Sequence, residues 1–486
     1  MRDDPPSSLD IAVIGAGFGG IGMAIALLGA GRRDFAVFER AAELGGTWRD
    51  NRYPGCACDV PSHLYSYSFA PNPAWSHRYA GWAEILQYLR GVATRHGVLP
   101  HLRCGHAVTR IDYDEARARW RLRLDDGRTV EARVVVSATG GFSTPRPPAI
   151  PGHETFAGAS CQSARGDDSI QFAGRRVAVI GTGASAIQLV PRLAAEAAAL
   201  TVFQRSAPWV VPRRDRALRA SEQRRYARWP VLQRLHRGAQ YALAEGRIFG
   251  FVLMPWLRRL VELEARWHLR RQIADPLLRA RLTPDYPLGC KRVLVSDDYY
   301  PALARAHVSL VDTPIECIGP AGPRTIDGRE HAVDVIVHAT GFEVAGELPY
   351  AVHGRGGRSL NAEWAGGGEA YYGLLAAGYP NLFTLLGPNT GLAHSSVIYM
   401  LESQVRYVID ALALLDRTGA RTLEARPEAQ AAFVRGVDRR LEGSVWTRCR
   451  SWYRGRDGRV SAIWPDFTFR YRARTRRADP RDLVLS

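Results

Sequence analysis

Ile11-Ala-Val-Ile14 runs directly into Gly15-Ala-Gly17-Phe-Gly-Gly20, and residues 21–28 continue with the composition of a helix. The apolar run predicts a short buried strand, and the glycines have the G-x-G-x-x-G spacing of a strand-to-helix turn. In such a turn Gly15 permits the tight bend, Gly17 lets the backbone approach a pyrophosphate, and Gly20 lets helix and strand pack closely. A second predicted strand, 35–38, ends at Glu39, nineteen residues after Gly20, where a carboxylate accepts hydrogen bonds from ribose hydroxyls.

The same pattern recurs further along the chain. Residues 177–180 form a short apolar run that leads into Gly181-Thr182-Gly183-Ala-Ser-Ala186, and a predicted helix follows at 187–193. The next predicted strand, 200–203, precedes Gln204-Arg205-Ser206, and Arg205 has the same offset from its turn as Glu39. A carboxylate suits the free 2′-hydroxyl of FAD, whereas a guanidinium suits the 2′-phosphate of NADPH. Two complete units with opposite terminal charges therefore predict two dinucleotide sites.

The segments around these units predict an α/β fold with two Rossmann-like domains. Alternating apolar residues at 120–124, a turn at Asp126-Gly127 and a returning strand at 129–136 predict a β-hairpin or meander. The turns Ala138-Thr-Gly140 and Ala339-Thr-Gly341 each follow a predicted strand and suit a crossing between domains. We expect an FAD-binding domain at 1–144 and 335–486, an NADPH-binding domain at 145–214 and 286–334, and a helical insertion at 215–285.

The net charge of +17 invites a nucleic-acid or membrane interpretation. However, Lys291 is the only lysine, and the arginines are spread along the whole chain. The densest basic run, 213–237, carries apolar residues at helical spacing, which indicates a solvated helix face rather than a polyanion groove. The apolar run 248–256 is too short to span a bilayer. It is expected to line a pocket or the core, with contact to a membrane surface as the less favoured alternative.

Seven cysteines, an odd number without paired spacing, argue against a disulfide framework. Cys56-Ala-Cys58 has no second ligand pair elsewhere, so no metal site is expected. The polar, acidic N-terminus lacks the apolar region of a signal peptide, and a cytoplasmic location is therefore expected.

With these features in place, nearly the whole chain resembles the FAD-binding flavoprotein monooxygenases of the Baeyer–Villiger and flavin-containing monooxygenase superfamily. The motifs that carry the resemblance, besides the two glycine turns and both Ala-Thr-Gly turns, are Gly45-Gly-Thr-Trp48, Tyr53-Pro-Gly55 with Asp59, Gly289-Cys-Lys-Arg292 with Tyr299-Tyr300, Leu386-Gly-Pro-Asn389 with His394-Ser-Ser396, Ser451-Trp-Tyr453 and Trp464-Pro465.

The Baeyer–Villiger fingerprint, F-x-G-x-x-x-H-x-x-x-W-P/D, aligns with residues 156–167. Phe156, Gly158 and Asp167 match, but Gln162 replaces the histidine and Gly166 replaces the tryptophan. Glutamine still donates and accepts hydrogen bonds but does not titrate. This departure weakens the assignment to ketone oxygenation without removing it, because the fingerprint histidine resembles a hinge element more than the group that transfers oxygen.

The resemblance implies a reaction in which NADPH reduces FAD and O₂ then forms a flavin C4a-peroxide. As an anion this peroxide attacks a ketone and gives an ester or lactone, whereas the protonated form oxygenates sulfur or nitrogen. Keeping the anion requires a fixed positive charge, and Arg292, positioned by Asp59, is the candidate. Baeyer–Villiger oxidation of an apolar ketone is therefore the leading expectation. Sulfur or nitrogen oxygenation, or an atypical NADPH-dependent flavin oxidase, stays open.

The resemblance also supplies the expected cofactor-binding set. Lys291 is assigned to the 2′-phosphate beside Arg205, and its survival as the only lysine suggests that arginine fails at this position. The full expected set comprises Gly15, Gly17, Gly20, Glu39, Thr47, Trp48, Asp59, Tyr65, Val108, Gly181, Thr182, Gly183, Ala186, Gln188, Arg205, Ser206, Lys291 and Asn389.

Overall fold

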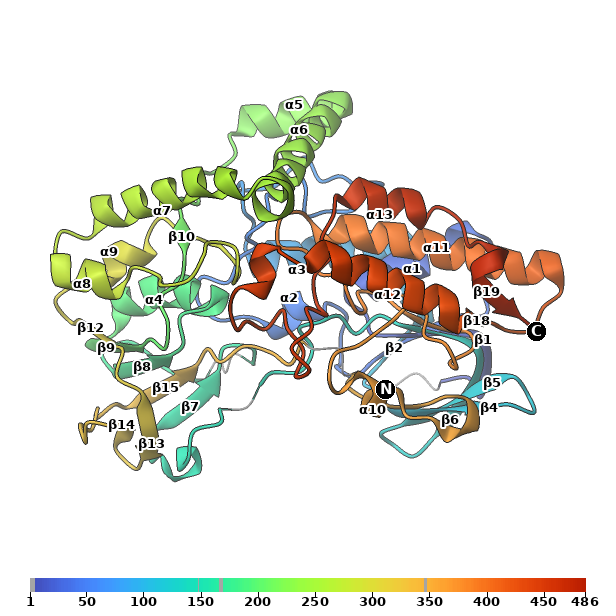
Figure 1. Ribbon diagram of the computed structural model, residues 1–486, viewed down its shortest axis with the longest axis horizontal. Coiled ribbons are helices and arrows are strands. Elements are labelled where there is room, and N and C mark those ends of the chain that lie inside the picture. The colour runs from blue at the N-terminus through green and yellow to red at the C-terminus, as the bar shows by residue number, and fades with distance from the viewer. Residues whose placement is uncertain (1–4, 147, 166–168, 345–347) are drawn as a thin grey trace.

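The computed structural model describes residues 5–146, 148–165, 169–344 and 348–486. Two separate larger sheets lie at the two lower sides of the molecule, and helices cover them from above (Figure 1). Each larger sheet contains one of the two predicted strand–turn–helix–strand units. The predicted α/β class is confirmed.

The first sheet has the strand order β16-β4-β5-β6-β1-β2-β3, and β17 also pairs with β6. Strands β6, β1, β2 and β3 run parallel, and β1 and β2 inside this group are largely apolar, as expected for strands covered on both faces. The predicted hairpin at 120–136 is present as antiparallel β5 and β6. The strand bounds are β1 Ser8–Ile14, β2 Phe35–Glu39, β3 Leu102–Cys104, β4 Val108–Asp114, β5 Arg119–Leu124, β6 Thr129–Ser137, β16 Ala351–His353 and β17 Leu382–Thr384.

The second sheet has the order β12-β9-β8-β15-β7 and is parallel throughout. Its strands are β7 Ala159–Gln162, β8 Arg176–Ile180, β9 Ala199–Phe203, β12 Val308–Val311 and β15 Val335–His338. The expected domain boundary at residue 335 is therefore wrong by one strand. Residues 335–338 pair with β8 and β7, so the second sheet continues to His338 before the chain returns to the first domain.

The two Ala-Thr-Gly turns have the same structural role in both units. Gly15 has φ +104° and Gly181 has φ +116°, a backbone conformation that favours glycine. A Cβ on Gly15 would lie 2.7 Å from the Ala138 carbonyl oxygen, and one on Gly181 would lie 2.6 Å from that of Ala339. Each small-residue turn thus packs directly against the first glycine of its own dinucleotide turn.

Helices fill the space around the sheets, and α1 packs against α11. Two short strand pairs, β13–β14 and β18–β19, and the pair β10–β11 complete the fold. Outside the insertion the remaining elements are α1 Phe18–Gly29, α2 Thr47–Asp50, α3 Trp82–Arg95, α4 Ala184–Glu196, α9 Tyr299–Leu303, α10 Leu360–Trp364, α11 Val397–Thr418, α12 Pro427–Leu441, α13 Thr468–Arg474, β10 Val210–Val211, β11 Leu294–Val295, β13 Ile315–Gly319, β14 Gly322–Thr325, β18 Leu423–Ala425 and β19 Leu483–Leu485.

Four helices lie in the predicted insertion; α5, α6 and α7 form the upper side of the molecule (Figure 1), whereas α8 lies beside the second sheet, where Arg281 donates to the Leu310 carbonyl of β12. They are α5 Ala220–Arg228, α6 Pro230–Ile248, α7 Arg258–Gln272 and α8 Pro276–Arg281. In the run 248–256, Ile248 and Phe251 are buried, but Phe249, Leu253, Met254 and Trp256 are exposed. The expectation that this run lines a pocket or the core is wrong for those four, because the turns between α6 and α7 lie on the outside. Among the described residues, no helix is long and apolar enough to cross a bilayer.

Candidate active site

The N-terminus of α1 has the properties of an anion site. The helix begins after Gly17 with no side-chain cap and no acidic residue in its first turn. A Cβ on Gly17 would approach only the Cα of Gly46, at 3.6 Å, so the backbone is open on this side. A Cβ on Gly20, by contrast, would lie 1.8 Å from the carbonyl oxygen of Gly15, which is the close packing predicted for the third glycine. The free N–H groups and open backbone fit a pyrophosphate.

Glu39 is a buried carboxylate at the end of β2. Its Oε2 accepts a hydrogen bond of 2.9 Å from the N–H of Ala16, inside the glycine turn, and its Oε1 accepts one of 3.0 Å from the N–H of Ala41. The guanidinium of Arg49 lies 2.9 Å from Oε1. Val108 begins β4 two residues after His106, whose N–H donates to the Glu39 carbonyl. The structure therefore brings Glu39 and Val108 to the same side of the turn.

Trp48 and Tyr65 form an aromatic wall beside the first turn. The indole N–H of Trp48 donates to the Tyr65 hydroxyl at 3.1 Å, and the two rings meet edge to face. Tyr65 also contacts Phe18, the first residue of α1, with ring centroids 5.4 Å apart. Thr47 opens α2, directly after Gly46. These three predicted residues are thus gathered at the N-terminus of α1.

The second turn repeats the open geometry. Helix α4 begins after Gly183 without a side-chain cap, and a Cβ on Gly183 would meet no atom of the described residues within 4 Å. Ala186 is buried where the first unit has its third glycine. The hydroxyl of Thr182 donates to the Ser206 carbonyl at 3.0 Å, which ties the turn to the end of β9. This turn also fits a pyrophosphate.

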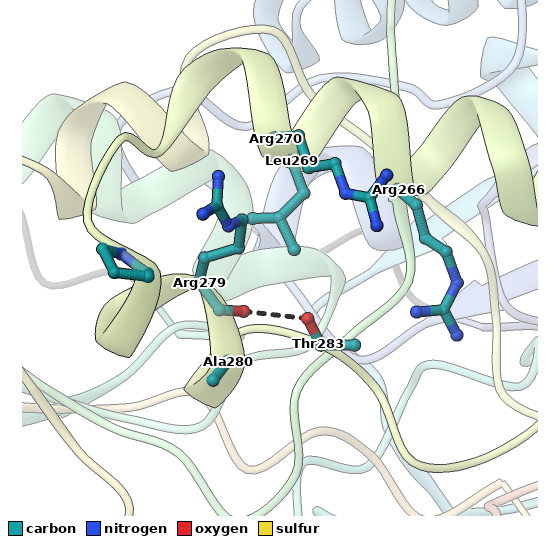
Figure 2. A pocket seen from close by; sticks show the side chains of 7 residues that line it. Arg266, Leu269, Arg270, Arg279, Ala280 and Thr283 are labelled. Carbon is teal, nitrogen blue, oxygen red and sulfur yellow. Dashed lines mark hydrogen bonds between the residues drawn. The ribbon is translucent and has the colours of Figure 1, made fainter.

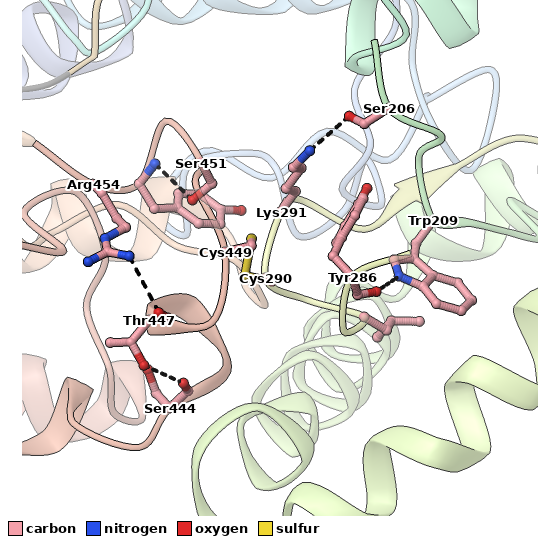
Figure 3. Close-up of a disulfide and its surroundings, with 12 residues drawn as sticks. Ser206, Trp209, Tyr286, Cys290, Lys291, Ser444, Thr447, Cys449, Ser451 and Arg454 are labelled. Atoms are coloured by element: carbon pink, nitrogen blue, oxygen red, sulfur yellow. Dashed lines mark hydrogen bonds between the residues drawn. A yellow bond between two sulfur atoms is a disulfide. The ribbon is translucent and has the colours of Figure 1, made fainter. Parts of the chain in front are cut away.

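Two cations lie at the end of β9. The ammonium of Lys291 donates to the Ser206 hydroxyl at 2.8 Å and lies 4.4 Å from the centre of the Tyr286 ring (Figure 3). Burial lowers the pKa of Lys291, and the nearby charge of Arg205 lowers it further. Arg205 itself is exposed. Two positively charged side chains beside a serine hydroxyl are suited to bind a phosphate group.

Arg292 and Asp59 form an ion pair between the two domains. The guanidinium places Nη2 at 2.6 Å and Nε at 2.7 Å from Oδ2 of Asp59. Nη1 donates to the Leu392 carbonyl at 3.3 Å. The negative charge of Asp59 is the main cause that raises the pKa of Arg292 above its ordinary value. The structure therefore holds a permanent positive charge in a fixed orientation.

Tyr453 is a site residue for which sequence reasoning assigned no role. Its side chain is fully buried, and burial raises its pKa to about 12, against the pull of the neighbouring Arg292 charge. The only sequence signal was the motif Ser451-Trp-Tyr453, which marked the region without a function.

Two predicted cofactor residues use their side chains to connect parts of the chain. The amide of Gln188, on α4, accepts from the Tyr53 hydroxyl and from the N–H of Ala57, and donates to the Ala57 carbonyl. The amide of Asn389 donates to the carbonyls of Val460 and Ile463. Gln188 thus joins the two domains and Asn389 holds the C-terminal segment. Their cofactor roles stay predictions.

The altered fingerprint lies at an edge strand. Gln162 ends β7, and its amide N–H is 3.5 Å from the Arg146 carbonyl, a weak contact in the linker between domains. Gly166 and Asp167 lie outside the described residues. This position is compatible with the expected hinge role of Gln162.

The expectation that the chain lacks disulfides is wrong. Cys290 and Cys449 are bonded, although 159 residues separate them (Figure 3). Cys290 immediately precedes Lys291, and Cys449 lies in the segment that carries Tyr453. Spacing analysis failed because neither cysteine has a nearby partner in sequence. The bond ties the loop that carries Lys291 and Arg292 to the C-terminal part of the first domain.

Comparison with known proteins agrees with this geometry. Residues 12–229 match the family model described as pyridine nucleotide-disulphide oxidoreductase. A Baeyer–Villiger monooxygenase of Pseudomonas aeruginosa is 45% identical over 473 residues, which cover 96% of this chain and 90% of the relative.

Solved structures extend the likeness to three dimensions. A steroid monooxygenase bound to NADP superposes with a TM-score of 0.86 and 33% identity, covering 98% of this chain and 99% of the other. A structure of OTEMO in complex with FAD and NADP gives a TM-score of 0.89 at 27% identity, with coverage of 98% and 99%. The chain therefore belongs to the Baeyer–Villiger monooxygenases, within the FAD- and NADPH-dependent flavoprotein monooxygenases.

Proposed function

We propose that this enzyme inserts one oxygen atom of O₂ beside the carbonyl of an apolar ketone and releases an ester or lactone. The family is that of FAD- and NADPH-dependent monooxygenases. The Arg292–Asp59 ion pair is the observation that supports a ketone as the substrate. Attack on a carbonyl develops negative charge, and a fixed guanidinium stabilises that charge.

The first domain would hold FAD. Gly17 leaves the pyrophosphate path open at the N-terminus of α1, whose N–H groups favour a negative charge, while Gly15 and Gly20 allow the close packing of the turn. Glu39 lies at the expected ribose end of that path, with Val108 beside it. Thr47, Trp48 and Tyr65 supply an aromatic and polar wall on the other side.

The second domain would hold NADPH. Gly181 and Gly183, with Thr182 and the buried Ala186, form the pyrophosphate turn. The cationic pair Arg205 and Lys291, with Ser206 between them, would bind the 2′-phosphate, since guanidinium and ammonium groups both donate charged hydrogen bonds to phosphate oxygens. NADH lacks this phosphate and would leave both cations unpaired.

FAD, when bound, accepts a hydride from NADPH and activates O₂ for transfer of one oxygen atom. Arg292 stabilises negative charge on the oxygen atoms during attack on the ketone. Asp59 fixes the guanidinium through Nε and Nη2, so the charge needs no reorientation when the reaction begins. Since Arg292 directly follows Lys291, a single loop carries the 2′-phosphate cation and the catalytic cation.

Product analysis under ¹⁸O₂ tests the proposal. The purified flavoprotein and NADPH would be given matched panels of apolar ketones and thioethers. We expect one labelled oxygen in an ester or lactone. Sulfoxides formed without ester or lactone would contradict the ketone assignment, and NADPH consumption with only hydrogen peroxide as product would indicate an oxidase.

A further inference from the structure

The exposed apolar side chains of this enzyme are concentrated on the helical insertion. Of the nineteen large apolar side chains exposed in the described residues, fourteen lie between residues 229 and 277. Scattered single exposures are normal on a soluble protein, but a concentration of this kind marks a contact surface. We name this surface the α6–α8 face; it comprises the exposed side chains of 229–281.

Helix α7 shows how the face is built. Four large apolar residues follow one another at intervals of four, three and four positions, which places them on one side of a helix. They are Trp256, just before α7, and Leu260, Leu263 and Trp267 within it. They are 61%, 59%, 62% and 56% exposed. The opposite side, with Ala265, His268 and Leu269, is buried against the protein. The helix therefore has a second apolar stripe that faces solvent, in addition to the one that faces the core.

Helix α6 continues the same surface. Val231, Leu232, Leu235 and Leu243 are exposed, and Trp229 lies exposed before its first residue. Besides Trp256, the turns between α6 and α7 add three more exposed apolar side chains, namely Phe249, Leu253 and Met254. Both helices and their connection lie on the upper side of the molecule (Figure 1).

The face is also strongly cationic. Residues 229–281 contain ten arginines against four acidic residues, a net charge of +6 out of +17 for the chain. Within the part of the chain that the structure describes, only Arg258 and Arg281 of these arginines form ion pairs. One of the four acids, Glu245, points inward, where it contacts His394 and Thr468. The outer surface therefore carries guanidinium groups with little compensating charge.

A pocket between α7 and α8 adds a specific feature. It has a volume of about 200 Å³. Arg266 and Arg270 reach it from α7 and Arg279 from α8, together with Thr283 (Figure 2). Of the described residues, no acidic one lines it. Arginine side chains from both helices line this small space and suit a phosphate group. Arg266, which also lies 5.4 Å over the Trp209 ring, directly precedes the exposed Trp267.

We propose that the α6–α8 face docks on a bilayer that contains anionic phospholipids. The leucines and tryptophans enter the boundary between headgroups and acyl chains, the arginines contact lipid phosphates, and one headgroup phosphate occupies the pocket between α7 and α8. A second copy of this chain is the weaker occupant, because a two-fold interface would place the same cationic surface against itself. This proposal does not depend on the substrate proposed above. It favours membrane contact, which the sequence alone had made the less favoured alternative for residues 248–256.

Vesicle flotation with the FAD-loaded enzyme tests this proposal. Phosphatidylcholine vesicles would be compared with vesicles of equal parts phosphatidylcholine and phosphatidylglycerol. We expect binding only to the anionic vesicles, with loss at high salt. Leu260→Ser combined with Leu263→Ser should weaken binding at least about tenfold. Arg266→Gln combined with Arg270→Gln and Arg279→Gln should also weaken it.

Ile326→Ser provides the matched control, because Ile326 is 64% exposed but lies after β14, outside the α6–α8 face. It should bind vesicles like the parent enzyme. All variants should keep flavin absorbance and lipid-free turnover, which shows that they are folded. Absence of wild-type flotation would overturn the proposal, as would equal binding to neutral vesicles. A lipid-free dimer that the leucine variant converts to monomer would assign the face to a second copy instead.

Discussion

Replacing Arg292 by alanine should separate oxygen transfer from flavin reduction. The guanidinium is held by two contacts to Oδ2 of Asp59, at 2.6 and 2.7 Å, and its side chain is 28% exposed. A unit positive charge about 4 Å from a developing negative charge contributes about 4 kcal/mol at an effective dielectric constant of about 20. Loss of one fixed donor of this kind typically costs about 10²–10³ in rate, or about 3–4 kcal/mol. We therefore expect Arg292→Ala to lose ester or lactone formation by that factor.

The assay needs two readouts. Anaerobic stopped-flow absorbance measures flavin reduction by NADPH, which requires no stabilised anion and should stay within a few-fold of the parent. Product analysis in air measures oxygen transfer, and hydrogen peroxide should replace the missing ester or lactone. Arg292→Lys should not restore transfer, because an ammonium on a flexible stem cannot reproduce the planar contacts to Asp59.

The reasoning is wrong if Arg292→Ala oxygenates ketones at nearly the parent rate. It is also wrong if flavin reduction and oxygen transfer fall together while FAD stays bound, since Arg292 would then act on the reductive step. Thioether oxygenation gives an internal comparison, because chemistry with a protonated oxidant should tolerate the substitution far better than ketone oxidation does.

Four further predictions concern cofactors, the linker and stability. Arg205→Ala should raise the KM for NADPH about 10- to 100-fold, which corresponds to the loss of one or two charged hydrogen bonds, and should leave the KM for NADH nearly unchanged. An equal rise in both KM values would show that Arg205 does not contact the 2′-phosphate. Gly15→Val should abolish the flavin absorbance of the purified protein, because its Cβ would lie 2.7 Å from a carbonyl oxygen; a fully yellow variant would remove FAD from this turn. Gln162→His should keep or improve the ratio of product to NADPH consumed, as expected for a hinge hydrogen-bonder; complete loss of activity would assign Gln162 a different local role. Cys449→Ser should lower the free energy of unfolding by about 2–5 kcal/mol, since the bond closes a loop across 159 positions; an unchanged denaturation midpoint under both oxidising and reducing conditions would show that the bond does not stabilise the protein.

The parts of the fold that depend on local sequence could be predicted. The turns at Gly15 and Gly181 follow from glycine spacing after apolar runs, and both have the positive φ that the motif requires. The sequence also predicted that Arg205 and Lys291 lie at one site. Each residue stands at a fixed position in its motif, at the end of a strand or in a loop, and the structure places the two charges close together. Strand β15 was assigned to the wrong domain, because its neighbours β7 and β8 lie more than 150 residues earlier and periodicity carries no pairing information.

The site itself was only partly predictable for the same reason. Gln188 and Asn389 were expected as cofactor-binding residues from the family resemblance, but their amides bond to backbone groups of distant segments. Tyr453 belongs to the site because the C-terminal segment packs beside Arg292, and this packing is visible only in the structure. The exposed stripe on α7 is a different case, since its leucine and tryptophan spacing is also that of a core-facing helix, and only the structure shows which side is buried.

The discontinuous first sheet has a consequence for synthesis on the ribosome. Strands β16 and β17, from residues 351–384, pair with β4 and β6, which emerge more than 230 residues earlier. All five strands of the second sheet, by contrast, lie between residues 159 and 338. The nascent chain can therefore complete its second nucleotide-binding domain while the first still exposes the apolar edge of β6 at Val135 and Val136. A nascent chain stalled before residue 382 would present that open edge to chaperones or to other chains, although half of the nucleotide-binding machinery was already folded.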